Sequence, residues 1–178
     1  MNVQLIINGE PETFEVTDSD TLLDALRRNG YTGTNRACDN GECGMCRVLV
    51  DGEPTESCDV AVTEMEGAAV ETIEGLGTQE DLHPIQAAFI DHAAVQCGYC
   101  TPGMVMTAKA FLEENPTPTE PEAREAIDDV LCRCTGYEKI VEAVLDAADR
   151  MNAERVAADG GSTGDPPGRG SNDGGDST

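Results

Sequence analysis

The eight cysteines constrain this 178-residue chain more than any other feature of its sequence. They fall into two groups of four. The first group, in RACDNGECGMCRVLVDGEPTESC, comprises Cys38, Cys43, Cys46 and Cys58. The second, in QCGYCTPGM and LCRCTGYEKI, comprises Cys97, Cys100, Cys132 and Cys134. The chain has no Trp, three Phe and three Tyr, so few large side chains are available for a hydrophobic core. Such a core needs additional cross-links, which cysteines supply through metal binding or disulfides.

The first group has the spacing C-x4-C-x2-C followed by a distant fourth cysteine, which is the plant-type arrangement for a [2Fe–2S] cluster. A cluster held by four thiolates is an anion in both oxidation states, so N–H donors must surround it when it is buried. Gly41 and Gly44 allow the backbone to approach closely at that point. The pattern predicts a [2Fe–2S] cluster, with zinc or disulfides as the alternatives.

The second group pairs C-x2-C with a distant C-x-C, a combination that also suits structural zinc. Pro102 is expected in the first turn of a helix, and Thr135-Gly136 is expected to precede another. Both cysteine pairs would then lie at helix N-termini, where free N–H groups favour an anionic cluster. Zinc thiolate sites are anionic too, so these residues alone leave zinc open.

The hydrophobic pattern divides the chain into an α+β part and a helical part. Strands are expected at residues 3–8 and 12–16, joined by a turn at Gly9-Glu10-Pro11, with a helix at 21–28 and a strand at 47–50. From about residue 83 to 151 the apolar period changes to 3.6, which predicts four short helices in a bundle. His83 before Pro84 is expected to start the first of these helices, and His92 to lie on its surface or in packing.

Residues 152–178 are mainly Gly, Asp, Ser and Pro, and we expect a disordered acidic tail there. The net charge of −24 argues against nucleic acid or an anionic membrane as a partner, because both would repel the chain. Only two of the eleven basic residues are Lys, a composition that resembles halophilic proteins; an acidic docking surface is the alternative. The sequence shows neither a signal peptide nor a membrane span, so a cytoplasmic protein is expected.

Taken together, the strings CDNGECGMC, ETIEGL, HPIQAAFIDHAAVQCGYCTPG and LCRCTGY closely resemble the iron–sulfur subunit of the molybdenum hydroxylases. This is the family of xanthine dehydrogenase, aldehyde oxidoreductase and aerobic carbon monoxide dehydrogenase. The resemblance covers about residues 3 to 150. Arg47, Asp59 and Asp129-Val130 depart from the family pattern, but no cysteine is missing.

The resemblance implies an N-terminal ferredoxin-like β-grasp domain (1–76) with one [2Fe–2S] cluster and a C-terminal four-helix bundle domain (77–151) with the second. It further implies that Gln96 and Cys134 lie against the molybdopterin of a partner subunit. In this family, electrons pass singly from molybdopterin through the helical-domain cluster and then the ferredoxin-type cluster to FAD.

This chain has no dinucleotide-binding fingerprint and is too short for a molybdopterin domain. A large molybdopterin-binding subunit and an FAD-binding medium subunit are therefore expected in a hetero-oligomer, where the molybdenum subunit selects the substrate. Alone, this oxidoreductase subunit is expected to turn over no substrate. Two other interpretations remain: a free-standing electron carrier, and a ferredoxin-like domain joined to a structural zinc module.

Three arginines flank cysteines, namely Arg36, Arg47 and Arg133. Each could offset the negative charge of a reduced cluster. Plain solvation is the alternative for each of them, and the sequence does not separate the two roles.

Overall fold

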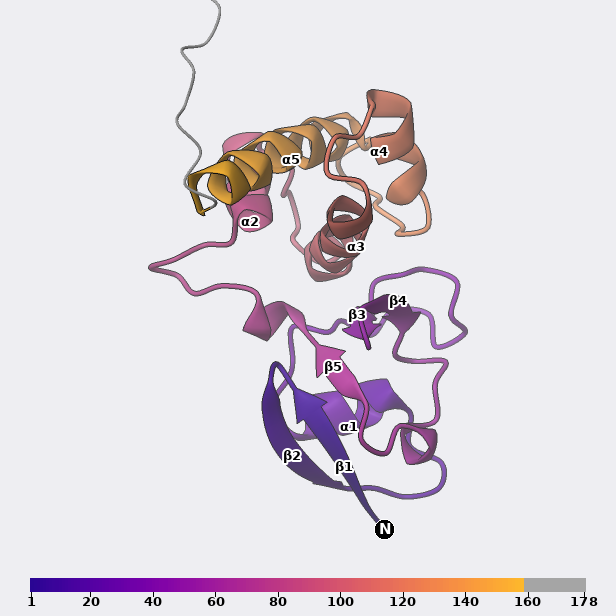
Figure 1. Cartoon of the computed structure of the whole chain (residues 1–178). Helices are drawn as coiled ribbons and strands as arrows, with labels where there is room; N and C mark the ends of the chain where they lie inside the picture. The colour runs from indigo at the N-terminus through magenta and orange to yellow at the C-terminus, as the bar shows by residue number, and fades with distance from the viewer. Residues whose placement is uncertain (159–178) are drawn as a thin grey trace, which may run out of the picture.

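The computed structural model describes residues 1–158, which form a mixed sheet followed by a group of helices (Figure 1). The five strands are β1 (Asn2–Ile7), β2 (Glu10–Glu15), β3 (Arg47–Val50), β4 (Glu53–Glu56) and β5 (Ala69–Glu71). Their order in the sheet is β2-β1-β5-β3-β4. Strand β1 pairs parallel to β5, and the other neighbours are antiparallel. This arrangement confirms the α+β class.

The first hairpin turns at Asn8-Gly9, so the expected turn at Gly9-Glu10-Pro11 is wrong. Ile7 pairs with Glu10, and both turn residues have positive φ, 52° for Asn8 and 87° for Gly9. Asn-Gly favours this two-residue turn because both residues tolerate the left-handed region. Pro11 lies within β2, which is an edge strand and therefore accommodates a residue without an N–H.

Helix α1 (Leu22–Arg28) covers the sheet with a fully apolar face. Its N-cap Thr21 accepts a hydrogen bond from the Asp24 N–H at 3.1 Å, and the Asp24 carboxylate accepts one from the Thr21 N–H. Leu22 and Leu26 pack with Leu5 and Phe14 of the sheet in one buried cluster. The capping box and this packing fix where the chain emerges from α1 into the cysteine loop.

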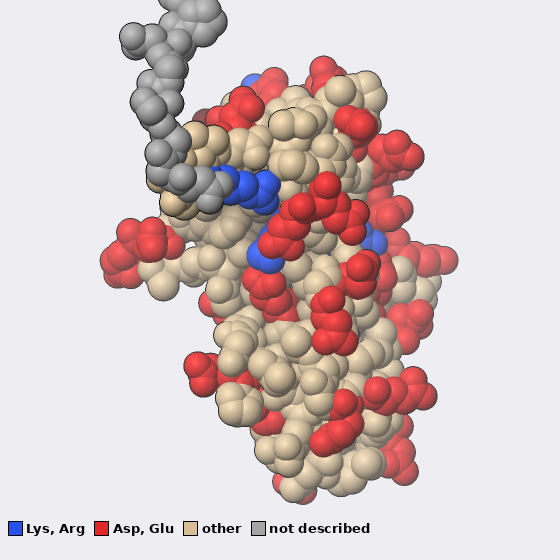
Figure 2. Space-filling model, in the orientation of Figure 1, with Lys and Arg blue, Asp and Glu red and all other residues tan. Residues whose placement is uncertain are grey.

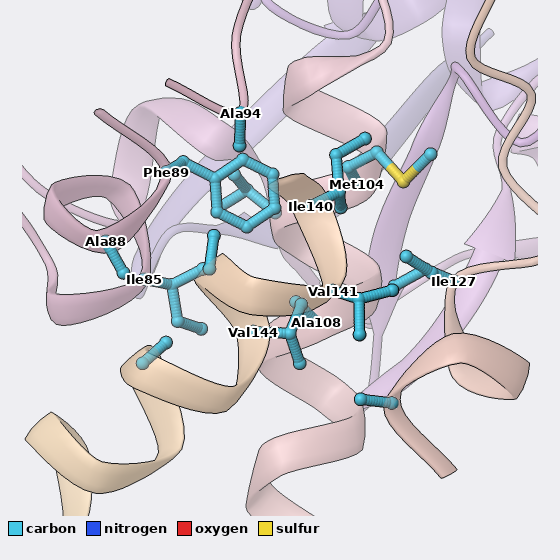
Figure 3. Close-up of a cluster of buried hydrophobic side chains, with 14 of the residues drawn as sticks. Ile85, Ala88, Phe89, Ala94, Met104, Ala108, Ile127, Ile140, Val141 and Val144 are labelled. Carbon is cyan, nitrogen blue, oxygen red and sulfur yellow. The ribbon is translucent and has the colours of Figure 1, made fainter. Parts of the chain in front are cut away.

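Four helices follow the sheet: α2 (Pro84–Asp91), α3 (Thr101–Glu114), α4 (Glu120–Ala126) and α5 (Glu138–Ala158). They surround an apolar core that includes Phe89, Met104, Ile140 and Val144 (Figure 3). Over the described residues the chain has five α-helices, of which α1 belongs with the sheet. The expected four-helix bundle is not confirmed, because two of the four helices after the sheet have only seven and eight residues.

The third expected helix is shorter than its apolar pattern indicated. It ends at Ala126, and Ile127 and Val130 are fully buried in the segment that follows. Helix α5 is longer than expected, since residues 152–158, assigned above to the disordered tail, are helical. Good helix formers such as Ala and Glu fill this segment, and the Asn152 side chain donates to the Pro116 carbonyl at 2.6 Å. The rest of the expected tail lies outside the described residues.

Helix α3 lies directly over β3 and joins the two halves of the molecule (Figure 1). Leu49 of β3 packs against Met106 and Ala110 of α3 in a small buried cluster. Next to it, the Lys109 ammonium lies 3.0 Å from the Glu71 carboxylate of β5. The contact between the halves is therefore both apolar and ionic.

The acidic composition is visible on the surface. Figure 2 shows Asp and Glu spread over both halves of one face, with few Lys and Arg among them. Among the helices of residues 1–158, none is both long and apolar enough for a membrane crossing.

Candidate metal centres

The first cysteine group lies in the loop between α1 and β3, with its fourth member just after β4. Cys43, Cys46 and Cys58 are buried and Cys38 is half-buried. The four side chains interact with one another, Cys43 with both Cys38 and Cys46, and Cys58 with both Cys46 and Cys38. Four thiols that surround one space are the donor set that a [2Fe–2S] cluster requires.

Backbone N–H groups point at the sulfurs of this first group. The N–H groups of Asn40, Glu42 and Cys43, with the Asn40 donor the strongest, hold the pKa of Cys38 down at about 7. The Gly41 N–H faces Cys58. Gly41 and Gly44 have φ of 74° and 66°, so the loop wraps around the sulfurs in a conformation that favours glycine.

Burial acts in the opposite direction on the deepest thiols. It is the main cause that raises the pKa of Cys58 to about 12 and that of Cys100 in the second group to about 12. Thiolates at such positions need nearby positive charge, and metal ions bound by the sulfurs would supply it. The residues present therefore fit a metal–thiolate cluster.

The second group brings together two loops that are distant in sequence. Cys97 and Cys100 lie between α2 and α3, and Cys132 and Cys134 lie between α4 and α5. The sulfurs of Cys97 and Cys134 are 3.4 Å apart, and Cys100 associates with Cys132. Cys100 and Cys132 are buried, whereas Cys97 and Cys134 are exposed. The second group thus brings four thiols together, two of them buried and two at the surface.

The expected position at helix N-termini holds closely for one pair only. Cys100 is the N-cap of α3, and Pro102 lies in the first turn. Helix α5 begins at Glu138, four residues after Cys134. The intervening loop is held by Tyr137, whose hydroxyl accepts from the Cys132 N–H at 2.8 Å and donates to the Val130 carbonyl.

Sequence reasoning missed the role of Tyr137. Its φ of 69° is unusual for a large residue, and its hydroxyl fixes the backbone of a cysteine five positions earlier. The adjacent string TGY offered a signal, since Gly136 also has positive φ. The Tyr137 hydroxyl therefore helps to position the loop that carries Cys132.

Disulfides and zinc are the alternatives from sequence. All eight cysteines are free thiols. Four thiolates per group also suit structural zinc, so the choice between zinc and an iron–sulfur cluster is a matter of metal content.

The two histidines lie apart from the cysteines. His83 is the N-cap of α2, as expected, and its Nδ1 accepts from the Ile85 N–H at 3.3 Å. His92 follows α2, and its Nε2 is 3.1 Å from the Asp146 carboxylate of α5. Both histidines organise helices.

Gln96, the other predicted site residue, lies directly before Cys97 and is exposed. It shares this exposed segment with Cys97, while Cys134 from the other loop is within contact of Cys97. The structure therefore brings Gln96 and Cys134 to the same part of the surface.

Two models of known families match the chain. The model described as "2Fe-2S iron-sulfur cluster binding domain" matches residues 5–74, and the one described as "[2Fe-2S] binding domain" matches residues 72–145. Each match contains one of the two cysteine groups. The class of protein is therefore an iron–sulfur protein with two [2Fe–2S]-binding domains, the first of them ferredoxin-like.

Relatives align with most of the chain. The nicotine 6-hydroxylase small subunit of Paenarthrobacter nicotinovorans is 43% identical over 152 residues, covering 85% of this chain and 92% of that protein. The aldehyde oxidoreductase iron-sulfur-binding subunit PaoA of Escherichia coli O157:H7 is 41% identical over 169 residues, covering 86% and 74%. A chain of quinoline 2-oxidoreductase from Pseudomonas putida 86 superposes with a TM-score of 0.83 at 46% identity, covering 87% and 96%.

This chain belongs to the family of iron–sulfur subunits of the molybdenum hydroxylases. It is an electron-transfer component of an oxidoreductase complex.

Proposed function

We propose that this chain relays single electrons from a molybdopterin-binding subunit to an FAD-binding subunit through two [2Fe–2S] clusters. Cys38, Cys43, Cys46 and Cys58 would hold one cluster, and Cys97, Cys100, Cys132 and Cys134 would hold the other. The observation that carries the proposal is the gathering of eight free thiols into two groups of four, each within the match of a [2Fe–2S]-binding family model. When bound, a [2Fe–2S] cluster accepts one electron at a time.

The direction of the relay is inferred from exposure. Cys97 and Cys134 are at the surface beside Gln96, whereas three of the four cysteines of the first group are buried. Electron transfer needs a short path, so the exposed pair is the place where an external cofactor can approach. We assign Gln96 and Cys134 to contact with the molybdopterin of the partner subunit.

The close contact between the halves favours transfer within the chain. The Asn35 amide donates to the Tyr99 carbonyl at 2.8 Å, and the Tyr99 hydroxyl donates to the Arg36 carbonyl. These bonds join the segment before the first cysteine to the loop of the second group. We propose a domain boundary at residues 76/77, with the helices of residues 77–151 as the domain of the second cluster.

The partners are inferred from the relatives. Two are named as small subunits, one of nicotine 6-hydroxylase and one of nicotinate dehydrogenase, so a hetero-oligomer with a large molybdopterin-binding and a medium FAD-binding subunit is proposed. In such a complex this chain does not act on substrate. Eight free cysteines favour a reducing compartment, and we infer the cytoplasm.

Purification of the tagged full chain from its own cells without air tests the partnership. Two larger subunits that carry molybdenum and FAD should accompany it. A chain that purifies alone with both clusters would instead establish the free-standing carrier.

The role of Gln96 can be tested in the same complex. The Gln96→Ala variant should slow reduction of the clusters by substrate, while both clusters and their iron content remain. Gln4→Ala changes another exposed glutamine, on β1, and should leave this rate unchanged. Equal rates in the two variants would exclude Gln96 from the electron path.

A further inference from the structure

Arg47 is a buried cation beside the first cysteine group. It follows Cys46 directly as the first residue of β3, and it is only 9% exposed. Its Nε donates to Glu56 Oε1 at 3.0 Å, and a terminal nitrogen contacts the same carboxylate oxygen. The other terminal nitrogen donates to the Thr107 hydroxyl of α3 at 3.3 Å. The guanidinium is therefore held by one group from the sheet half and one group from the helical half of the molecule.

The other two arginines that flank cysteines differ from Arg47. Arg133 is exposed, and the Arg36 side chain is 39% exposed and pairs with the carboxylates of Asp24 and Asp39. Solvent and salt screen charges at such positions. The structure thus separates the three arginines: Arg47 is buried, whereas the other two are open to solvent.

Arg47 and Glu56 also border the same open hollow as two of the sulfur-bearing residues. The lining residues include Cys38, Cys43, Arg47, Glu56 and Asp129. Asp129 lies 3.9 Å from the guanidinium and is largely exposed. Of these three charged side chains, Arg47 is buried, Glu56 is half-buried and Asp129 is exposed. Arg47 and Glu56 are therefore the two charges held at the hollow that Cys38 and Cys43 also line.

We propose that Arg47 and Glu56 form a charge pair that sets the reduction potential of the cluster in the first cysteine group. This inference rests on the proposed function. Reduction adds one electron and therefore one negative charge, with no bond made or broken. The Arg47 charge favours the reduced form, and the Glu56 charge opposes it. Their balance places the potential between the values that either charge alone would give.

A buried Arg–Glu pair can also be merely structural, since such pairs hold elements together. The two roles predict different signs. Loss of either partner loosens a structural pair in the same direction, whereas the two charges shift a potential in opposite directions.

The test is a redox titration of the full chain loaded with iron and sulfide, with each cluster followed by its own electron paramagnetic resonance signal. Arg47→Met should lower the equilibrium constant for reduction of the first cluster about tenfold, which lowers its reduction potential by about 59 mV for one electron. Glu56→Gln should raise it by a similar factor. In the double variant, which removes both charges, the reduction potential of the first cluster should return close to the parent value. Arg47→Lys keeps the positive charge and should change that potential little.

Lys109→Met is the matched control, because Lys109 also joins the halves. Its side chain is 12% exposed and pairs with Glu71 and Glu113 at 3.0 and 2.7 Å, away from the cysteine hollow. This variant should lower stability and leave the first cluster's potential unchanged. The signal of the second cluster provides an internal control in every variant.

Shifts of one sign in Arg47→Met and Glu56→Gln, or an equal shift in Lys109→Met, would overturn the proposal and leave the proposed function intact. Parent protein that takes up no cluster in the first group would overturn both. If Arg47→Met fails to fold, Glu56→Gln still tests the proposal, because an unchanged or lowered potential of the first cluster in that variant would overturn it.

Discussion

The backbone N–H of Leu131 donates a hydrogen bond of 3.0 Å to the carbonyl oxygen of Cys43. Leu131 directly precedes Cys132, so this bond joins a cysteine segment of the first group to one of the second. Gly44 and Gly103 meet at the same place: a Cβ on Gly103 would lie 2.5 Å from the Gly44 carbonyl oxygen. The two candidate centres are therefore held together by backbone groups that leave no room for side chains.

Gly103→Ala tests this close approach. The added methyl group must displace the Gly44 backbone, which costs about 1–3 kcal/mol of unfolding free energy. It should also alter the electron paramagnetic resonance signal of the cluster in the first group. Urea unfolding and the spectrum of the reduced protein measure the two effects.

Gly9→Ala is a suitable control for this variant. Nothing lies within 4 Å of a Cβ at Gly9, but its φ of 87° strains any L side chain. Gly9→Ala should lower the unfolding free energy by about 1–2 kcal/mol and leave the electron paramagnetic resonance spectrum of the parent unchanged. A parent spectrum in Gly103→Ala as well would show that the contact does not position the first loop.

His83 makes stability depend on pH. Burial is the main cause that lowers its pKa below the ordinary 6.5, and the Lys109 ammonium adds to this. A histidine whose pKa is lower in the folded state than in the unfolded state stabilises the fold at pH values above its unfolded pKa. That contribution is lost as the pH falls through the folded-state pKa. Unfolding free energy should therefore fall as pH drops below about 6.5, because the neutral ring caps α2 and the protonated ring does not.

His83→Asn isolates this contribution, since Asn also caps helices. The variant should show a flatter pH profile of urea unfolding between about pH 5 and pH 8. His92→Asn should leave unchanged the contribution of His83 to the pH dependence of the unfolding free energy. An unchanged slope in His83→Asn would show that another group governs this range.

The acidic surface should make the protein dependent on salt. With a net charge of −24, repulsion between carboxylates opposes folding, and screening lengths fall from about 30 Å at 0.01 M to about 3 Å at 1 M salt. The urea midpoint should rise markedly with potassium chloride concentration. A midpoint that does not respond to molar salt would argue against the halophilic interpretation of the composition.

The cysteine spacing alone allowed both ligand sets to be predicted, because three of the four cysteine segments carry two or more cysteines close together in sequence. The pairing of Cys97 with Cys134 could not be deduced, since it depends on how two loops meet. Strand β5 was missed because three residues, Ala69–Glu71, carry no pattern, and only pairing with β1 and β3 makes them a strand.

The burial of Arg47 was equally out of reach from the sequence. Its partners lie nine and sixty positions away, at Glu56 and Thr107, and the second belongs to the other half. A single charge in an apolar strand does not reveal whether it is solvated or paired. The helix boundaries near Ala126 and Ala158 also depended on tertiary packing, which overrides local propensity.

The central claim is that the eight cysteines hold two [2Fe–2S] clusters. The most direct test measures iron, acid-labile sulfide and zinc on the full chain purified without air, with electron paramagnetic resonance of the reduced form. About four iron and four sulfide per chain with two distinct signals are expected. About two iron and one zinc, with a single signal, would contradict the account and leave only the ferredoxin-like half with a cluster.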